Sequence, residues 1–167
     1  AINLNDLFPK DLHRLPNLRS ITFQGFSHFQ LSCKPLWQLQ QVEHLIFHGI
    51  ELHDFGDRFQ LLSQLKTIQL SYCKIQLLHR DFFKVPKLEK LCLQGQQLPP
   101  FLDRLFQIKT LHTLKIMDIK IDNIATEQLS QLDLLTSLEL IRTGIKQTES
   151  RRLKKVLAKV QVTTLKK

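Results

Sequence analysis

Apolar residues recur along most of the chain in a phrase that repeats every 23 or 24 residues. The phrase begins at Leu15, Leu39, Leu62, Val85, Ile108 and Leu132, and a damaged seventh copy keeps Leu157, Val160 and Val162. Each full copy carries apolar residues at its positions 1, 4, 7 and 9, as in LSQLKTIQL from Leu62. A repeat of this length predicts a solenoid of stacked units rather than a globule built around one pocket.

Within each repeat, the alternation at positions 7 and 9 predicts one short strand whose apolar side chains point inward. We expect six strands, near residues 20–23, 44–47, 67–70, 90–93, 113–116 and 137–140. The rest of each repeat should return the chain by a helix or turn, and position 22 should supply an apolar plug, which is Leu36, Leu61, Phe83, Phe106, Leu129 or Leu153. Pro35, Pro99–Pro100 and an N-cap at Asn123 suit the starts of such helices.

This pattern resembles the leucine-rich-repeat consensus, L-x-x-L-x-L-x-x-N/C-x-L, over residues 15–165. The resemblance implies an α/β fold, a curved right-handed solenoid shaped as a horseshoe arc, with a parallel concave sheet and helices or turns on the convex side. Position 12 departs from the family, because residues such as Ile50, Cys73 and Thr143 stand where the family often has asparagine. We therefore expect less regular turns at that position.

The register divides the chain into three parts. Residues 1–14 form an N-terminal half-repeat or cap, residues 15–153 hold six repeats of about 23 residues, and residues 154–167 form a degenerate repeat with a basic tail. An amphipathic helix is predicted at the start of that last part, from a stripe of Leu153, Val156, Leu157 and Val160. The register places Lys159, Gln161 and Thr163 on the concave face of the seventh copy.

The basic charge of the chain is concentrated at one end. The formal net charge is +9, of which residues 1–83 contribute +1 (eight Lys and Arg against seven Asp and Glu) and residues 84–167 contribute +8. No stretch approaches the ~18 apolar residues of a membrane span. Three cysteines without tight spacing argue against a disulfide framework, so we expect a cytoplasmic, reducing compartment.

The register also predicts which side chains cover the concave face. The candidate partner-binding residues are His44, Ile46, His48, Thr67, Gln69, Tyr72, Lys90, Cys92, Gln94, Lys115, Met117, Glu139, Ile141 and Arg142. Isolated exposed apolar residues are common in proteins. Several exposed apolar residues on one surface, however, favour a protein-binding interface with apolar anchors. We expect the centre of this interface at Tyr72. Lys90 and Lys115 would favour an acidic patch on the partner.

Catalytic and metal chemistry find little support in the sequence. His44 and His48 would share one face of a strand but lie ~13 Å apart, too far to bind one metal ion. Cys92 is expected to face outward beside Lys90, which would lower its pKa and make it a candidate nucleophile, but no His–Asp partner accompanies it. Its alternative interpretation is an ordinary strand residue. We expect no enzyme activity, no cofactor, no metal and no small-molecule substrate.

The favoured hypothesis is a non-catalytic module that grips a protein partner on its concave sheet and modulates or inhibits it by steric occlusion. In its richness in Leu, Gln, Lys and Phe and its lack of cysteine caps, the chain also resembles leucine-rich-repeat effectors of intracellular bacterial pathogens. That resemblance implies secretion into a host cell, and a host protein or a fellow effector as partner. The alternative is binding of nucleic acid or anionic surfaces through the basic C-terminal end, although aromatic residues for base stacking are lacking there.

Overall fold

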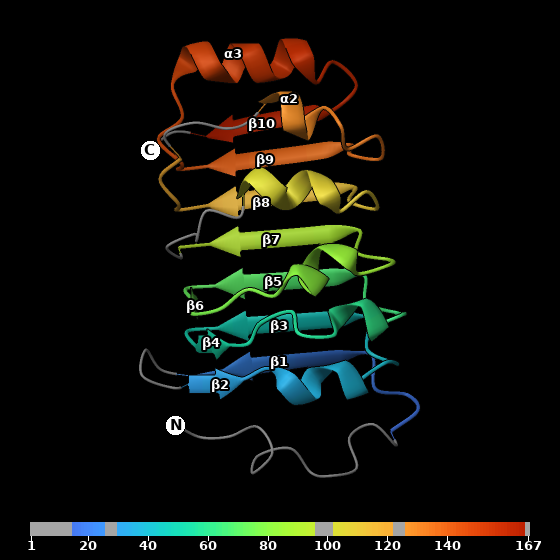
Figure 1. Cartoon of the computed structure of the whole chain (residues 1–167). Coiled ribbons are helices and arrows are strands. Elements are labelled where there is room, and N and C mark those ends of the chain that lie inside the picture. The colour runs from blue at the N-terminus through green and yellow to red at the C-terminus, as the bar shows by residue number, and fades with distance from the viewer. Residues whose placement is uncertain (1–14, 26–29, 96–101, 122–125, 166–167) are drawn as a thin grey trace.

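A parallel sheet with one strand from each repeat forms one face of the protein. The computed structural model describes residues 15–25, 30–95, 102–121 and 126–165. Its seven strands lie in the order β1 (Ser20–Gln24), β3 (His44–His48), β5 (Thr67–Ser71), β7 (Lys90–Gln94), β8 (Thr113–Met117), β9 (Ser137–Ile141) and β10 (Gln161–Leu165) (Figure 1). The six predicted strands are confirmed, and each extends one residue further than expected.

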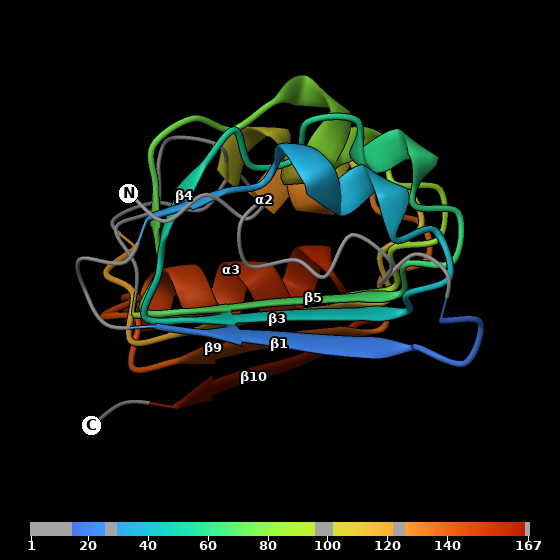
Figure 2. The same cartoon turned by 90° about the horizontal axis from the view of Figure 1, so that it is seen from below.

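Short helices on the return segments form the opposite layer. They are η2 (Lys34–Gln38), η3 (Phe59–Leu61), η4 (Arg80–Lys84), η5 (Leu102–Gln107), α2 (Thr126–Leu129) and α3 (Gln147–Val156). Pro35 lies in the first turn of η2, as predicted. In Figure 2, the end strands β1 and β10 lie farther from the helical layer than β3 and β5 do, so the solvent-facing side of the sheet is concave. The predicted α/β solenoid is thus the observed fold.

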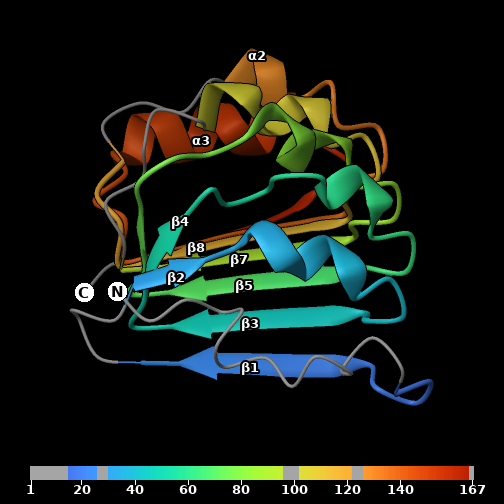
Figure 3. The ribbon, with the colours of Figure 1, turned by 60° about the horizontal axis from the view of Figure 1, so that its bottom comes forward.

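A second, smaller sheet was not predicted from the sequence. It consists of the parallel strands β2 (Gln30–Ser32), β4 (Glu51–His53) and β6 (Lys74–Ile75). In Figure 3, β2 and β4 lie at the end of the molecule toward which the arrowheads of β3 and β5 point. These strands satisfy backbone groups of the return segments of the first three repeats, where the family's asparagines are missing.

The inward columns of the sheet pack into one continuous core. At position 9, Phe47, Leu70, Leu93, Ile116 and Leu140 are each at most 1% exposed, and Phe23 packs against this core from the edge strand. A chain of phenylalanine rings fills the N-terminal half, with centroids 5.1 to 5.5 Å apart: Phe23, Phe47, Phe55, Phe59, Phe82 and Phe83. The burial of these rings therefore ties the first three repeats together.

The predicted plug is wrong in the second repeat. Leu61 is 41% exposed, and Phe59, two residues earlier, is fully buried in its place. Phe106 is only half-buried, while the neighbouring Leu105 is fully buried. In these two repeats, counted from Leu39 and Val85, the turns η3 and η5 bury the residue at position 21, which is Phe59 or Leu105. The other four predicted plugs are buried.

Two details of the C-terminal end are also corrected. Gln161 pairs with Ser137, so the seventh strand begins two residues later than predicted, and Gln161, Thr163 and Leu165 take the concave positions. Helix α3 ends at Val156, whose side chain is 43% exposed, so Val156 does not belong to the buried stripe. The proposed half-repeat at 1–14, Pro99–Pro100 and Asn123 lie outside the described residues.

Candidate protein-binding surface

The strand register brings the fourteen predicted residues together on the concave face. Three of them lie at position 6 of adjacent strands (His44, Thr67 and Lys90), five at position 8 (Ile46, Gln69, Cys92, Lys115 and Glu139) and four at position 10 (His48, Gln94, Met117 and Ile141). Paired residues in neighbouring strands are separated by ~4.8 Å, so each row is a continuous strip of side chains. Tyr72 and Arg142 follow at position 11, where the strands end.

Position 11 requires an unusual backbone conformation. Gly49 and Gly95 have φ of +66° and +59° there, in the left-handed region that suits glycine. Tyr72, Asp118 and Arg142 occupy the same position with φ of +54°, +57° and +52°. Each non-glycine residue costs roughly 1–2 kcal/mol in that conformation. Three side chains are therefore held at the edge of the concave face despite a local cost in stability, which is typical of functional positions.

Tyr72 is positioned by Gly95 on one side of its ring and by His48 on the other. Its side chain is 52% exposed, yet its ring lies directly over Gly95, where a Cβ atom would come within 2.4 Å of Tyr72 Cε1. On the other side, the ring of His48 contacts it edge-on, with centroids 5.7 Å apart. The Tyr72 hydroxyl accepts a hydrogen bond from Gln94 Nε2 at 3.2 Å. The tyrosine is thus a preorganised, solvent-accessible aromatic group.

A polar chain continues from Tyr72 along the same edge. Gln94 Nε2 also donates to Asp118 Oδ2 at 3.2 Å, and Arg142 donates two hydrogen bonds to the Asp118 carboxylate, from Nε at 2.5 Å and from its terminal nitrogen at 2.7 Å. The hydrogen bonds that Arg142 donates to Asp118 raise the pKa of the Arg142 guanidinium. We call His48, Tyr72, Gln94, Asp118 and Arg142 the Tyr72 ridge. Asp118 was missing from the predicted set, although its place in the column of glycines 25, 49 and 95 could have indicated it.

The two concave lysines differ in their surroundings. Lys115 Nζ lies 2.8 Å from Glu139 Oε2, so its charge is already compensated within the chain. Lys90 is exposed and has no ion pair among the residues that the structure describes. The concave face therefore offers one available cation at its centre, at Lys90, rather than the two that the sequence suggested.

Cys92 is not the outward-facing nucleophile that the sequence allowed. Its neighbours cover it to 7% exposure, and burial raises the pKa of its thiol although Lys90 and Lys115 act in the opposite direction. A protonated, covered thiol is a poor nucleophile. Within residues 15–25, 30–95, 102–121 and 126–165, no three His, Cys, Asp or Glu side chains are grouped to hold a metal ion, and no helix is both long and apolar enough to cross a bilayer.

Comparisons with known proteins identify the fold. No protein-family model and no curated protein matches the chain. Among solved structures, a leucine-rich-repeat protein of Leptospira interrogans superposes with a TM-score of 0.68 at 24% identity, over 93% of this chain and 39% of its own. The fold is that of leucine-rich-repeat proteins. An internalin of Listeria monocytogenes superposes with a TM-score of 0.61 at 15% identity, over 93% of this chain and 44% of its own. The chain spans about two fifths of the length of these structures.

Proposed function

We propose that this leucine-rich-repeat chain is a non-catalytic module that binds another protein on its concave sheet, with the Tyr72 ridge as the centre of contact. The observation that supports this proposal most directly is the fixed and exposed position of the Tyr72 side chain. It is half-exposed, held in a left-handed conformation and braced by His48, Gly95 and Gln94. A fixed tyrosine loses little conformational entropy when a partner covers it, and it offers both apolar area and a hydroxyl.

The surroundings of the ridge support a partner of mixed polarity. Ile46, Met117 and Ile141 are half-buried side chains in the position 8 and position 10 rows, and they would pack against apolar groups of the partner. Lys90 would face an acidic group. The Asp118–Arg142 pair at one end keeps both charges satisfied, so covering it would leave no unpaired charge in the interface.

We further propose that the partner is an enzyme or another protein whose surface is occluded by the sheet, and that the chain acts as a bacterial effector. Support for the bacterial setting comes from the composition of the chain and from the bacterial source of its structural neighbours. The three cysteines are free thiols, which suits a reducing host cytoplasm.

The test begins with capture of the partner from host-cell lysate, by wild-type protein and by Tyr72→Ala in parallel, followed by mass spectrometry. With the captured partner purified, Tyr72→Ala should weaken binding by about 2 kcal/mol, or roughly thirtyfold, without unfolding the array. Lys90→Glu should mainly slow association with an acidic partner.

The controls are Gln107→Glu and Lys84→Glu, two exposed substitutions on the helical side. Both should leave the affinity unchanged. If these convex variants weaken binding and Tyr72→Ala does not, the concave surface is the wrong site even though the fold stands.

A further inference from the structure

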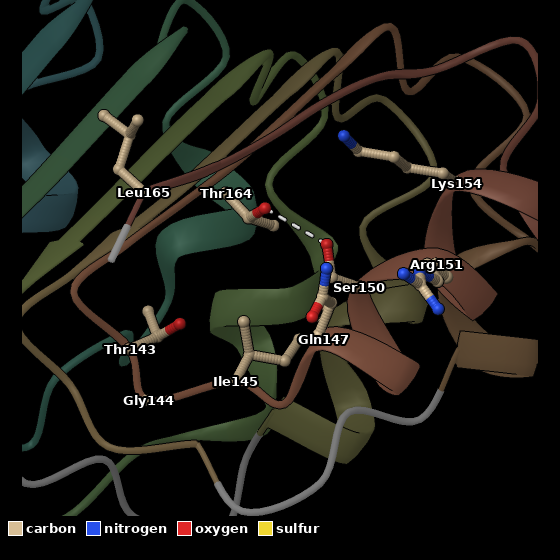
Figure 4. A pocket seen from close by; sticks show the side chains of 9 residues that line it. All are labelled: Thr143, Gly144, Ile145, Gln147, Ser150, Arg151, Lys154, Thr164 and Leu165. Atoms are coloured by element: carbon tan, nitrogen blue, oxygen red, sulfur yellow. Dashed lines mark hydrogen bonds between the residues drawn. The ribbon is translucent and has the colours of Figure 1, made fainter. Parts of the chain in front are cut away.

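The C-terminal end of the array contains a pocket that the concave-surface proposal does not use. It has a volume of about 440 Å³ and lies between α3, the end of β10 and the turn at residues 143–146 (Figure 4). The side chains that matter for its chemistry are Thr143, Ser150, Arg151, Lys154 and Thr164. They come from a segment of the sequence that showed only an excess of positive charge.

Hydroxyl groups replace apolar side chains at this end of the core. Thr164 occupies position 9 of β10, the inward column that holds leucine, isoleucine or phenylalanine in every other repeat. Its hydroxyl lies 3.1 Å from that of Ser150 on α3. Thr143 is 1% exposed, and its Oγ1 has no hydrogen-bond partner among the described residues. Figure 4 shows this hydroxyl turned toward the pocket. Buried hydroxyls are almost always hydrogen-bonded, so an unpartnered one beside a pocket is a place where water or a polar ligand would bind.

Two available cations lie on the rim of the pocket. Arg151 and Lys154 are exposed on the face of α3 that lines it, and neither has an ion pair in the described part of the chain. The intervening Arg152 points elsewhere, because it pairs with Glu127 and Glu149. The pocket face of α3 is therefore cationic, while its acidic residue is engaged on another side of the helix.

The start of α3 adds hydrogen-bond donors. The ten-residue helix begins at Gln147, which lines the pocket, and its N-cap residue Lys146 provides no side-chain cap. The first N–H groups of a helix lack partners within the helix, and its dipole favours negative charge at this end. Glu149 in the first turn accepts a hydrogen bond from Thr126 at 2.9 Å, so its carboxylate is held on the side of α2.

We propose that this pocket binds a phosphate group, carried on a small phosphomonoester or free as inorganic phosphate. Arg151 and Lys154 supply charge-assisted hydrogen bonds, Thr143 and Ser150 supply hydroxyl donors, and the start of α3 supplies backbone donors. The volume of about 440 Å³ exceeds that of a phosphate ion and leaves room for the alcohol that carries it. This site shares no residue with the Tyr72 ridge, although Thr143 directly follows Arg142 of the ridge, and it does not depend on the partner proposed for the ridge.

The test is calorimetric titration of the full chain with inorganic phosphate, at an ionic strength held constant with sodium chloride. We expect saturable binding at one site per chain. Arg151→Gln and Lys154→Gln should each weaken it about tenfold or more, because each removes a charged donor. Lys155→Gln is the matched control, since it removes the same charge from the same helix outside the pocket. Its affinity should equal that of the wild type.

Thr143→Val provides the second variant, because it keeps the shape of the buried side chain and removes only the hydroxyl. It should weaken phosphate binding several-fold while the melting temperature stays at or above that of the wild type. Wild-type affinity in Thr143→Val would place the ion on the helix surface and overturn the proposal. No saturable binding, or an equal loss in Lys155→Gln and Lys154→Gln, would overturn it as well.

The source of the phosphate is distinguished by two further ligands. Tighter binding of O-phosphoserine than of inorganic phosphate would support a phosphomonoester, and equal binding would support the free ion. An oligothymidylate without terminal phosphate carries only diesters. If it binds and inorganic phosphate does not, the basic end is a diffuse nucleic-acid surface and the pocket proposal is wrong.

Discussion

Replacing Tyr72 by glycine and by alanine separates the backbone cost of this residue from the contribution of its ring. Both substitutions remove the ring and its contacts with His48, Gly95 and Gln94. Only alanine keeps a Cβ atom at a φ of +54°. The difference in stability between the two variants therefore reports the backbone at this position and not the ring.

The magnitude of this difference follows from two opposing effects. Glycine removes a strain of roughly 1–2 kcal/mol. It also loses more backbone freedom on folding than alanine, which costs about 0.5–1 kcal/mol. We therefore expect Tyr72→Gly to be more stable than Tyr72→Ala by about 0.5–1 kcal/mol.

Equilibrium unfolding in urea, followed by circular dichroism, measures this difference. With a denaturant slope of about 2 kcal/mol/M, the midpoint of Tyr72→Gly should lie about 0.25–0.5 M above that of Tyr72→Ala, at an unchanged slope. The two variants should lose the same affinity for the partner, about thirtyfold, because the missing ring is common to both. A midpoint for Tyr72→Gly at or below that of Tyr72→Ala would refute the strain argument.

Three further predictions concern the core, the thiols and the basic end. Leu91→Ala should lower the free energy of unfolding by about 2–5 kcal/mol because Leu91 is fully buried. Leu61→Ala should lower it by less than about 1 kcal/mol because Leu61 is 41% exposed. Equal losses in urea unfolding would contradict the corrected register. Burial raises the pKa of all three thiols, so iodoacetamide should label the native protein slowly at pH 7 and faster as the pH rises. Rapid labelling of Cys92 at pH 7 would contradict its burial. The basic cluster comprises Arg151, Arg152, Lys154 and Lys155. Neutralising it should leave the partner affinity, measured by surface plasmon resonance, nearly intact and should abolish phosphate binding, measured by calorimetry. A large loss of partner affinity, together with a wild-type affinity that falls steeply with salt, would instead favour an anionic partner surface.

The phosphate pocket and the Tyr72 ridge lie at different places in the array and consist of different residues. The ridge follows the ends of β3, β5, β7, β8 and β9, whereas the pocket lies between α3 and β10. The two sites meet at the end of β9, where Arg142 of the ridge is followed directly by Thr143 of the pocket. A partner that covers Arg142 would therefore lie beside the phosphate pocket.

The repeat period was sufficient to assign the large sheet. Side chains alternate along a strand with a period of two, and the spacing of 23 or 24 residues brings equivalent positions side by side in adjacent strands. This is why the strands from Ser20 to Ile141 and the concave rows through Ile46, Lys90 and Met117 could be assigned in register from the amino-acid sequence alone. A slip of one residue would have turned the leucines toward solvent, so burial of one face fixes the register.

Features that depend on irregular backbone could be seen only in the folded chain. The buried position of the convex turn changes from one repeat to the next, so that Phe59 rather than Leu61 fills the core. The register of the seventh strand, two residues later than predicted, was established only by its pairing with β9, and this register places Thr164 beside the pocket. In the sequence, the left-handed conformation of position 11 is indicated only by the glycines at that position in three repeats. A backbone angle can be inferred from sequence only where it restricts which residues occur. Tyr72 is an exception to that exclusion, and only its contacts in the folded chain show how it is held.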